Sequence, residues 1–212
     1  MSIVGIVPAG GSGERLGADR PKAFVALGGR AMLDWSVEVL SGACDRVVVA
    51  VPPGHECEPD RVTGGASRSA SVRNALAAAP GAELVVIHDA ARPLLTPDLV
   101  QRCIAAAREA DGAIAAAPIT DTVKEADPSG RIVRTLDRTS LWSIQTPQVF
   151  GADILRRALA VDDATLAAAT DDASLVEAAG GTVVVVQAPA ENLKVTTAGD
   201  LRRAEGILAD RC

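Results

Sequence analysis

Short apolar runs and longer amphipathic stretches alternate along most of this chain. The apolar runs lie at 3–7, 46–51, 84–88, 112–117 and 182–187. Their short length and mostly apolar composition are typical of strands, and the first run is typical of a buried one. Between them we predict helices at 31–40, 69–79, 97–110, 152–161 and 172–179 and at the C-terminus, with Thr96 as the N-cap of the third. This alternation predicts an α/β fold with helices on a largely parallel sheet.

Residues 120–138 break the pattern. Apolar and polar positions alternate on both sides of Asp127-Pro-Ser-Gly130, a turn sequence, so we predict a β-hairpin with strands near 122–126 and 131–135. The hairpin has too few apolar residues for a core of its own. We expect it to project from a single domain, 1–212, and to pack on a second subunit.

The composition narrows the possible functions. A net charge of −6 over 212 residues argues against a general nucleic-acid binder. No apolar run reaches the ~18 residues that a membrane span needs, and no secretory signal is evident, so we expect a cytoplasmic protein. The four cysteines, which form no C-x-x-C pair, are expected to be reduced structural thiols: Cys44, Cys57, Cys103 and Cys212.

A glycine-rich loop follows the first predicted strand, with glycines at 10, 11 and 13 and the cations Arg15 and Lys22 after them. Such a loop lets main-chain N–H groups approach an anion closely. A dinucleotide fingerprint is excluded because Leu16 occupies the third glycine position and the second strand runs into prolines. The P-loop string is absent. A glycine turn without a ligand remains the simple alternative.

Asp89 follows the third predicted strand directly. Ligands of open α/β sheets bind at the carboxyl ends of the strands, so Asp89 can face the glycine loop and hold Mg²⁺ against phosphates. The alternative is that Asp89 caps a turn, and His88 is expected to be a packed strand residue. Of 21 basic residues only Lys22, Lys124 and Lys194 are lysines, which favours a need for a compact ammonium at some of these positions.

Several strings together resemble one family. They are Ala9-x-Gly11-x-Gly13-x-Arg15, Pro21-Lys22, Gly64-Gly65, Arg68, Ser71-Val72, His88-Asp-Ala-Ala-Arg-Pro93, Asp121-Thr-Val-Lys124, Asp137-Arg138, Thr146-Pro-Gln148, Thr170-Asp171 and Asn192-Leu-Lys-Val-Thr196. In this order they are similar to the 2-C-methyl-D-erythritol 4-phosphate cytidylyltransferase family. The chain departs from the family pattern at Gly10, Ala23, Ala66 and Ser67. Ala66 and Ser67 stand where the family often has acidic residues, and the base contacts there are expected from the backbone.

The resemblance implies a Rossmann-like (GT-A-like) nucleotidyltransferase fold, a homodimer built with the hairpin arm, and Mg²⁺ or another divalent cation at Asp89. It implies transfer of CMP from CTP to methylerythritol phosphate, with pyrophosphate released. The implied catalytic residues are Arg15, Lys22 and Lys194. The implied CTP-binding residues are Pro8, Ala9, Gly10, Gly11, Ser12, Gly13, Gly64, Gly65, Arg68, Ser71 and Asp89. The implied residues for the polyol phosphate are Ala90, Arg92, Thr122, Arg138 and Thr170, with Thr122 and Arg138 acting in the partner's site.

Rival functions differ mainly in the second substrate. A ribitol-5-phosphate cytidylyltransferase shares most of these strings, and the polyol pocket has to decide between the two. The His88-Asp-Ala-Ala-Arg-Pro93 string counts against sugar-1-phosphate and molybdopterin guanylyl enzymes. Intact Arg15, Lys22, Asp89 and Lys194 count against a silent nucleotide-binding scaffold, and Lys124 is left as structural.

Overall fold

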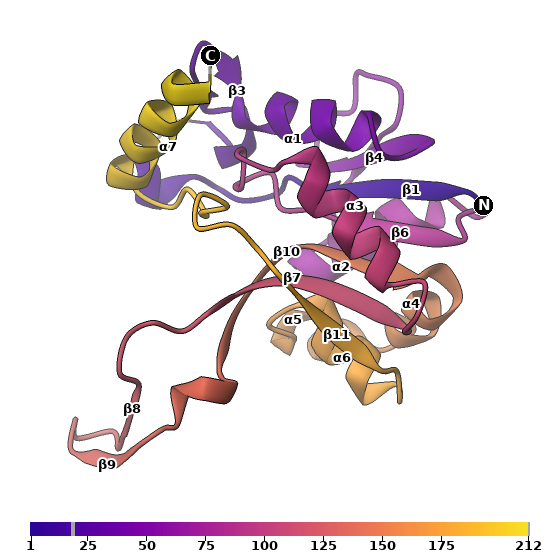
Figure 1. Ribbon diagram of the computed structural model, residues 1–212. Coiled ribbons are helices and arrows are strands. Elements are labelled where there is room, and N and C mark those ends of the chain that lie inside the picture. The colour runs from indigo at the N-terminus through magenta and orange to yellow at the C-terminus, as the bar shows by residue number, and fades with distance from the viewer. Residues whose placement is uncertain (18–19, 212) are drawn as a thin grey trace.

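The structure, a computed structural model, describes residues 1–17 and 20–211. Within these residues a seven-stranded sheet has the order β11-β7-β10-β6-β1-β4-β5 (Figure 1). Its strands are β1 (Ile3–Pro8), β4 (Arg46–Val51), β5 (Arg61–Thr63), β6 (Leu84–Ile87), β7 (Gly112–Pro118), β10 (Trp142–Gly151) and β11 (Val183–Gln187). Strand β10 runs antiparallel to both its neighbours, and the other pairs are parallel. The mixed, mostly parallel sheet confirms the predicted fold class.

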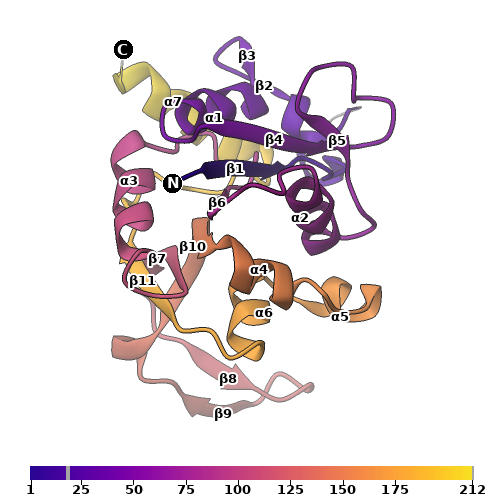
Figure 2. The same cartoon turned by 90° about the vertical axis from the view of Figure 1, so that its right-hand side faces the viewer.

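Helices cover both faces of this sheet (Figure 2). Helices α1 (Met32–Ser41) and α3 (Pro97–Ala106) pack on one face. On the other face lie α2 (Arg68–Ala77), α4 (Ala152–Ala158), α5 (Asp163–Ala168) and α6 (Asp172–Ala178). Along β4, Val48 and Ala50 enter one core while Val49 and Val51 enter the other. Because both faces are covered, each central strand appears in the sequence as a continuous apolar run.

Several element boundaries differ from the predictions. Neither strand β5 nor helix α5 is among the predicted elements. Both are short, so neither shows a periodicity that the sequence alone can reveal. The predicted cap of α3 is confirmed, because Leu99 N–H donates to Thr96 Oγ1, but the helix ends at Ala106 rather than at residue 110. After the helix, Arg108 N–H and Glu109 N–H donate to carbonyls only three residues earlier, so the α-helical bonding pattern ends before β7.

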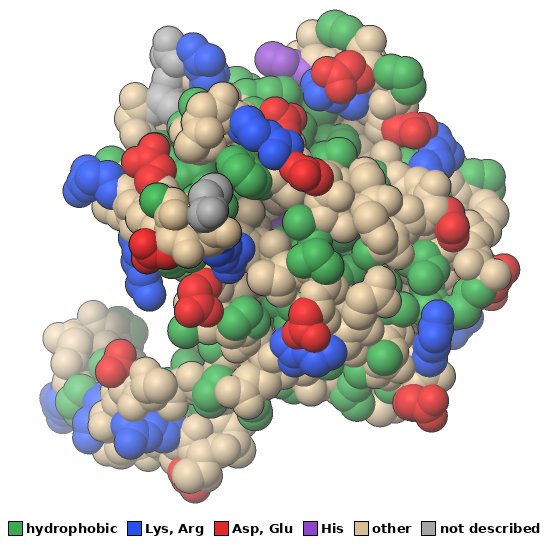
Figure 3. Space-filling model, turned by 45° about the horizontal axis from the view of Figure 1, so that its top comes forward, with side chains coloured by type: hydrophobic (Ala, Val, Ile, Leu, Met, Phe, Trp, Pro, Cys, Tyr) green, Lys and Arg blue, Asp and Glu red, His purple; other side chains and the backbone are tan. Residues whose placement is uncertain are grey.

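The predicted hairpin is confirmed as a projecting arm. It consists of β8 (Lys124–Ala126) and β9 (Ile132–Thr135), whose residues are all exposed. Asp127 O accepts a bond from Gly130 N–H at 2.9 Å, and Gly130 has φ +84°, which favours glycine. The arm stands away from the body in Figures 1 and 3. The second subunit that it was expected to contact stays a prediction.

A third, smaller core lies beside the sheet. It joins the C-terminal helix α7 (Ala198–Arg211) to the short pair β2 (Ala26–Leu27) and β3 (Arg30–Ala31). Its buried members are Leu27, Met32, Leu94, Val195 and Ala204. Because these come from the two ends and the middle of the chain, this core ties distant segments together.

Two further observations concern thiols and membranes. Cys44, Cys57 and Cys103 are free thiols, and Cys212 lies outside the described residues. Within the part of the chain that the structure describes, no helix combines the length and the apolar character needed to cross a bilayer.

Candidate active site

The glycine loop leaves the carboxyl end of β1 and returns to its own start. Ala9 N–H donates to Ala50 O on the neighbouring strand at 2.8 Å, which fixes the exit of the loop. Lys22 N–H then donates to Gly11 O at 2.9 Å. This bond places the main chain of Lys22 directly beside the glycines, although eleven positions separate the two residues.

Gly13 is required by its conformation and by its surroundings. Its φ of +84° is unfavourable for other residues, and a Cβ there would lie 2.8 Å from Arg20 O. Short 3₁₀ turns follow, η1 (Glu14–Leu16) with Arg15 and η2 (Lys22–Phe24) with Lys22. A side chain at position 13 would therefore push apart the two segments that carry these cations.

The loop lines a cavity of about 540 Å³. Fourteen of the predicted residues line it: Pro8, Ala9, Gly10, Gly11, Ser12, Gly13, Arg15, Lys22, Gly65, Arg68, Ser71, Asp89, Ala90 and Lys194. Residues from the start, middle and end of the chain thus meet in one place, as the resemblance implied. Ala90, expected at the polyol phosphate, lies in this first cavity.

The Gly64-Gly65 segment is held by the start of α2. Gly64 N–H donates to Val51 O at 2.8 Å, and Gly64 itself does not line the cavity. Gly65 N–H donates to Ser71 Oγ at 3.0 Å, and a Cβ on Gly65 would lie 2.5 Å from Ala70 Cβ. The Ser71 hydroxyl donates to Ser67 O at 2.9 Å. Ser71 therefore shapes the loop, with its hydroxyl already bonded inside the protein.

Asp89 forms the centre of the site's ion pairs. Lys194 Nζ lies 2.7 Å from its Oδ2, and Arg68 Nε lies 2.8 Å from its Oδ1. Burial works to raise the pKa of Asp89, but the charges of Arg68 and Lys194 outweigh it and hold that pKa below its ordinary value. The carboxylate is therefore ionised, and both its oxygens carry a cationic partner.

Lys22 lies in an environment that opposes its charge. Burial lowers its pKa to about 8, and the neighbouring charges of Lys194 and Arg15 act in the same direction. Arg15, Lys22 and Lys194 thus form a group of cations that repel one another around the cavity. A polyanion placed between them would relieve that repulsion, which is the property expected of a triphosphate site.

A second cavity, of about 640 Å³, adjoins the first. It contains Arg92 and Thr170 from the predicted set and shares Arg68, Asp89 and Lys194 with the first cavity. The two cavities therefore meet at the ion pair of Asp89 and Lys194. This junction is where groups bound in the two cavities would come into contact.

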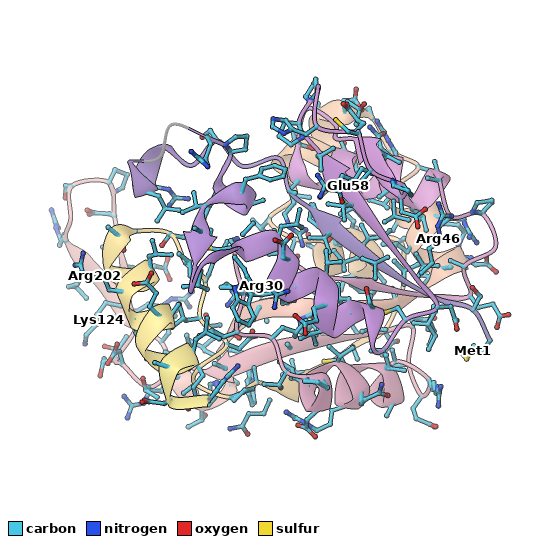
Figure 4. The ribbon with its side chains drawn as sticks, turned by 90° about the horizontal axis from the view of Figure 1, so that it is seen from above. Met1, Arg30, Arg46, Glu58, Lys124 and Arg202 are labelled. Atoms are coloured by element: carbon cyan, nitrogen blue, oxygen red, sulfur yellow. The ribbon has the colours of Figure 1, made fainter. Side chains whose placement is uncertain are left out.

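Two predicted residues lie on the arm, outside both cavities. Thr122 is exposed, and Arg138 Nη1 donates to Thr120 O at 2.5 Å. Figure 4 shows Lys124, also on the arm, at the opposite end of the molecule from Met1 and Arg46. Within one described chain the arm is therefore not part of the site, and Lys124 has no contact with the reaction centre.

A buried network of hydrogen bonds holds the main chain at Asp89. Asp89 N–H donates to Thr146 Oγ1, the Thr146 hydroxyl contacts His88 Nδ1, and His88 Nε2 contacts Arg92 O, each at 3.0 Å. These partners fit a neutral imidazole protonated on Nε2. Burial lowers the pKa of His88 to about 4, so it stays neutral. His88 is therefore a packed residue as expected, although it lies one position beyond the end of β6.

Asn192 extends the network toward Lys194. Its Nδ2 donates to Gln145 Oε1 at 2.8 Å and to Thr146 O at 2.9 Å. Its main-chain oxygen accepts a bond from Arg92 Nη1 at 2.7 Å. These hydrogen bonds hold the segment that carries Lys194 in place through Asn192, two residues before it.

The small core places the three cations. Leu16 follows Arg15, Val25 lies shortly after Lys22, and Val195 follows Lys194, and all three pack in the core with α7. Val195 N–H also donates to Ala91 O at 2.8 Å. Helix α7 thus holds segments from both ends of the chain without itself carrying a predicted site residue.

Sequence reasoning missed several lining residues. In the first cavity these are Leu16, Ala23, Ala66, Ser67, Ala91 and Thr196, and in the second they include Trp142, Gln145, Gln148, Asp171 and Glu177. It also missed Asp172, a buried partner of Arg68. The acidic pair at 171–172 signals only the start of a helix in the sequence, and Asp171 does cap α6. Nothing local distinguishes an acid that caps a helix from one that reaches a distant arginine.

The donor set fits a divalent ion that is held mainly by phosphates. Asp89 supplies one ionised carboxylate at the junction of the cavities. Among the described residues no group of three or more His, Cys, Asp or Glu could enclose a metal. Mg²⁺ is commonly bound by one or two carboxylates with phosphates and water as its remaining ligands. The residues present therefore suit Mg²⁺ that arrives with a nucleotide.

Comparisons with known proteins agree with this geometry. A family model described as 2-C-methyl-D-erythritol 4-phosphate cytidylyltransferase matches residues 3–210. The protein of that name from Saccharopolyspora erythraea is 44% identical over 233 residues, which cover 99% of this chain and 100% of that protein. A bifunctional enzyme from Anaeromyxobacter dehalogenans is 44% identical over 223 residues, which cover 97% of this chain and 57% of that protein.

The fold comparison gives the same answer. The crystal structure of 2-C-methyl-D-erythritol 4-phosphate cytidylyltransferase from Thermus thermophilus superposes with a TM-score of 0.85 and 35% identity, covering 99% of this chain and 100% of that one. The match to the family model, the similarity to full-length relatives and the shared fold all cover nearly the whole chain. The chain therefore belongs to the 2-C-methyl-D-erythritol 4-phosphate cytidylyltransferase family.

Proposed function

We propose that this chain transfers CMP from CTP to 2-C-methyl-D-erythritol 4-phosphate, giving 4-diphosphocytidyl-2-C-methyl-D-erythritol and pyrophosphate in the non-mevalonate route to isoprenoid precursors. The observation that carries the proposal is the junction of the two cavities at Arg68, Asp89 and Lys194. A nucleotide in the first cavity and a polyol phosphate in the second would meet there. The reaction needs such a meeting of two anions.

The chemistry requires charge stabilisation more than proton transfer. The attacking group is a phosphate oxygen, largely dianionic near neutral pH because the second pKa of a phosphate monoester is about 6. It forms a bond to the α-phosphorus, and the bond from that phosphorus to the bridging oxygen of the pyrophosphate breaks. No strong general base is needed. The barrier lies in bringing anions together and in stabilising the charge that builds on the α-phosphate.

The cations of the first cavity supply that stabilisation. The glycine-loop N–H groups would cradle the triphosphate, while Arg15 and Lys22 would neutralise the transition state and the leaving pyrophosphate. A bound triphosphate would raise the depressed pKa of Lys22 and keep it protonated. Lys194 would leave Asp89 and contact the α-phosphate, a short movement because its ammonium already lies at the junction.

A divalent ion completes the site in this proposal. Asp89 would hold Mg²⁺, and when bound the ion would neutralise part of the negative charge of the phosphates. The carboxylate is already ionised without it, because Arg68 and Lys194 hold its pKa down. The protein therefore presents a metal ligand that does not have to lose a proton before the ion binds.

The arm supplies the last part of the proposal. Ile132 and Val133 on β9 are 55% and 60% exposed, and Trp142 and Ile144 at the base of the arm are also exposed. We infer that a second copy of the chain covers them in a cytoplasmic homodimer. Thr122 and Arg138 would then reach the second cavity of the other copy, where Arg138 would bind the phosphate of the polyol.

A pyrophosphate-release assay tests this function. With CTP and Mg²⁺ present, methylerythritol phosphate should give rapid release, and ribitol 5-phosphate should give about 1% of that rate, the order of discrimination that a pocket achieves against a polyol of different shape. Lys194→Met should abolish release, while the matched exposed cation change Arg202→Met on α7 should not (Figure 4). Equal rates with the two polyols, or no release with either, would refute the proposed function.

A further inference from the structure

Arg68 connects three elements through two carboxylates. It is the first residue of α2, and its side chain reaches Asp89 after β6 and Asp172, the first residue of α6. Arg68 Nε lies 2.8 Å from Asp89 Oδ1, and Arg68 Nη1 lies 2.5 Å from Asp172 Oδ2. Two different nitrogens of one guanidinium are therefore each paired with a different acid.

Asp172 is costly to keep where it lies. Its side chain is 0% exposed, and its Oδ1 is buried without a hydrogen-bond partner. Burial raises its pKa above the ordinary value, although Arg68 opposes that shift. A half-satisfied buried carboxylate costs free energy, and a buried ion pair often contributes little net stability. The ion pair of Asp172 is therefore expected to contribute little to the stability of the fold.

The position of Arg68 explains what the acid can do. A guanidinium prefers a two-pronged pairing in which Nε and the adjacent Nη2 contact both oxygens of one carboxylate. In this structure Nε contacts only Oδ1 of Asp89, while Nη1 is drawn to Asp172. Oδ2 of Asp89 instead accepts a hydrogen bond from Lys194 Nζ. Without Asp172, Arg68 would be free to turn and take both oxygens.

We propose that Asp172 is a positioning residue that acts through Arg68. It keeps Arg68 on Oδ1 of Asp89 and so leaves Oδ2 available, first to Lys194 and then to the divalent ion that arrives with the nucleotide. This inference rests on the proposed function, since it assumes that Asp89 faces the metal. Asp172 itself lines neither cavity and is not a catalytic residue.

Binding of Mn²⁺ tests the inference without turnover. Free Mn²⁺ is followed by electron paramagnetic resonance in the presence of CTP and the absence of any polyol phosphate. Asp172→Asn keeps the shape and removes the charge, and it should weaken Mn²⁺ binding by about 10-fold because Arg68 then competes for Oδ2. Asp172→Glu keeps the charge and should stay within about threefold of wild type.

A matched control separates this effect from the loss of an ion pair as such. Arg73 Nη2 pairs with Asp163 Oδ1 at 2.6 Å on the surface, so Asp163→Asn also removes an acid from an arginine. Asp163→Asn should bind Mn²⁺ as wild type does. Equal weakening in both Asn variants, or none in Asp172→Asn, would overturn the inference.

A double variant keeps the test decisive if Asp172→Asn does not fold. Arg68→Met with Asp172→Asn removes both charges of the buried pair, so no uncompensated charge stays buried. If Asp172 acts only through Arg68, this double variant should bind Mn²⁺ within about twofold of Arg68→Met alone. A further 10-fold loss in the double variant would show that Asp172 acts by another route.

Failure of the proposed function would look different. In that case wild type would release no pyrophosphate from CTP and methylerythritol phosphate, or Asp89→Asn would bind Mn²⁺ and CTP as well as wild type. If both wild-type tests succeed and Asp172→Asn still binds Mn²⁺ normally, only the inference about Asp172 fails.

Discussion

At the scale of single residues, Lys22 shows what it costs to hold a cation in a partly buried position near other cations. The ammonium is partly buried between Lys194 and Arg15, and burial with these charges lowers its pKa from 10.5 to about 8. A lowered pKa in the folded state means that charging Lys22 opposes folding. The protein therefore holds the cation at a cost that a bound triphosphate would remove.

Lys22→Met should stabilise the protein and show a specific pH dependence. Below about pH 8 Lys22 is charged in both the folded and the unfolded chain, so the variant gains most there. We expect a melting temperature about 2–4 °C above wild type near neutral pH, after allowing for solvent screening of a partly exposed group. The difference should fade between about pH 8 and pH 10.5, as wild type loses the proton. Differential scanning calorimetry checks this, and a constant difference at all pH values would contradict it.

The same residue should be needed for turnover. Lys22→Met and Arg15→Ala should each lower kcat by about 10²-fold or more, because each removes a charge that stabilises the transition state. Steady-state pyrophosphate release gives kcat, and calorimetric titration shows whether CTP still binds. Near-normal turnover with CTP bound would remove that residue from the catalytic set.

At the scale of elements, α7 supports the site although none of its residues lines either cavity. Leu208 packs in the small core, and its Cδ1 lies 3.8 Å from where a Cβ on Gly28 would be. That core also contains the neighbours of Arg15, Lys22 and Lys194. Loosening it should therefore displace cations from both ends of the chain, and small displacements of positioned groups are costly in catalysis.

Leu208→Ala should separate stability from activity. We expect a stability loss of about 1–2 kcal/mol, less than for a fully buried leucine, together with an approximately 10-fold lower kcat/KM for CTP. The control is Leu159→Ala in the core beneath the sheet, where Leu159 is 1% exposed. It should cost about 2–5 kcal/mol with little change in kcat/KM under conditions where the variant is folded. Urea unfolding and initial rates measure both, and parallel losses in the two variants would refute a positioning role for α7.

At the scale of the whole molecule, the arm determines whether the site belongs to one chain or to two. Its strands bury none of their residues in a single chain, and Thr122 and Arg138, just outside these strands, do not line the second cavity. A homodimer that exchanges arms would bring both residues to the other copy. The proposal can be tested by mixing variants that are inactive alone.

Lys22→Ala and Arg138→Ala subunits should complement each other. In a mixed dimer one site has intact Lys22 in its body and intact Arg138 on the other copy's arm, while the second site lacks both. Random exchange of subunits makes about half the dimers mixed, so activity should recover to about a quarter of wild type. Refolding the two variants together, with each refolded alone as a control, gives the result. No recovery would mean that the arm serves its own chain or none.

Much of this architecture could be predicted from local patterns. The central strands, the arm and the glycine loop were all found because each has a periodicity or a turn sequence of its own. Short elements such as β5 and α5 were missed for lack of such a pattern. Local patterns do not predict β10 either, because an antiparallel strand within a mostly parallel sheet is defined by its neighbours.

The sequence by itself determined the layered α/β class, the projecting arm, the glycine loop with its cations and the family. Each of these depends on residues close together in the chain or on strings in a fixed order. Only the tertiary structure decided how the charges are paired. Lys194 meets Asp89 across 105 positions, and Asp172 meets Arg68 across 104. Such contacts depend on how α2, β6, α6 and the segment before α7 pack, and no local spacing encodes that packing.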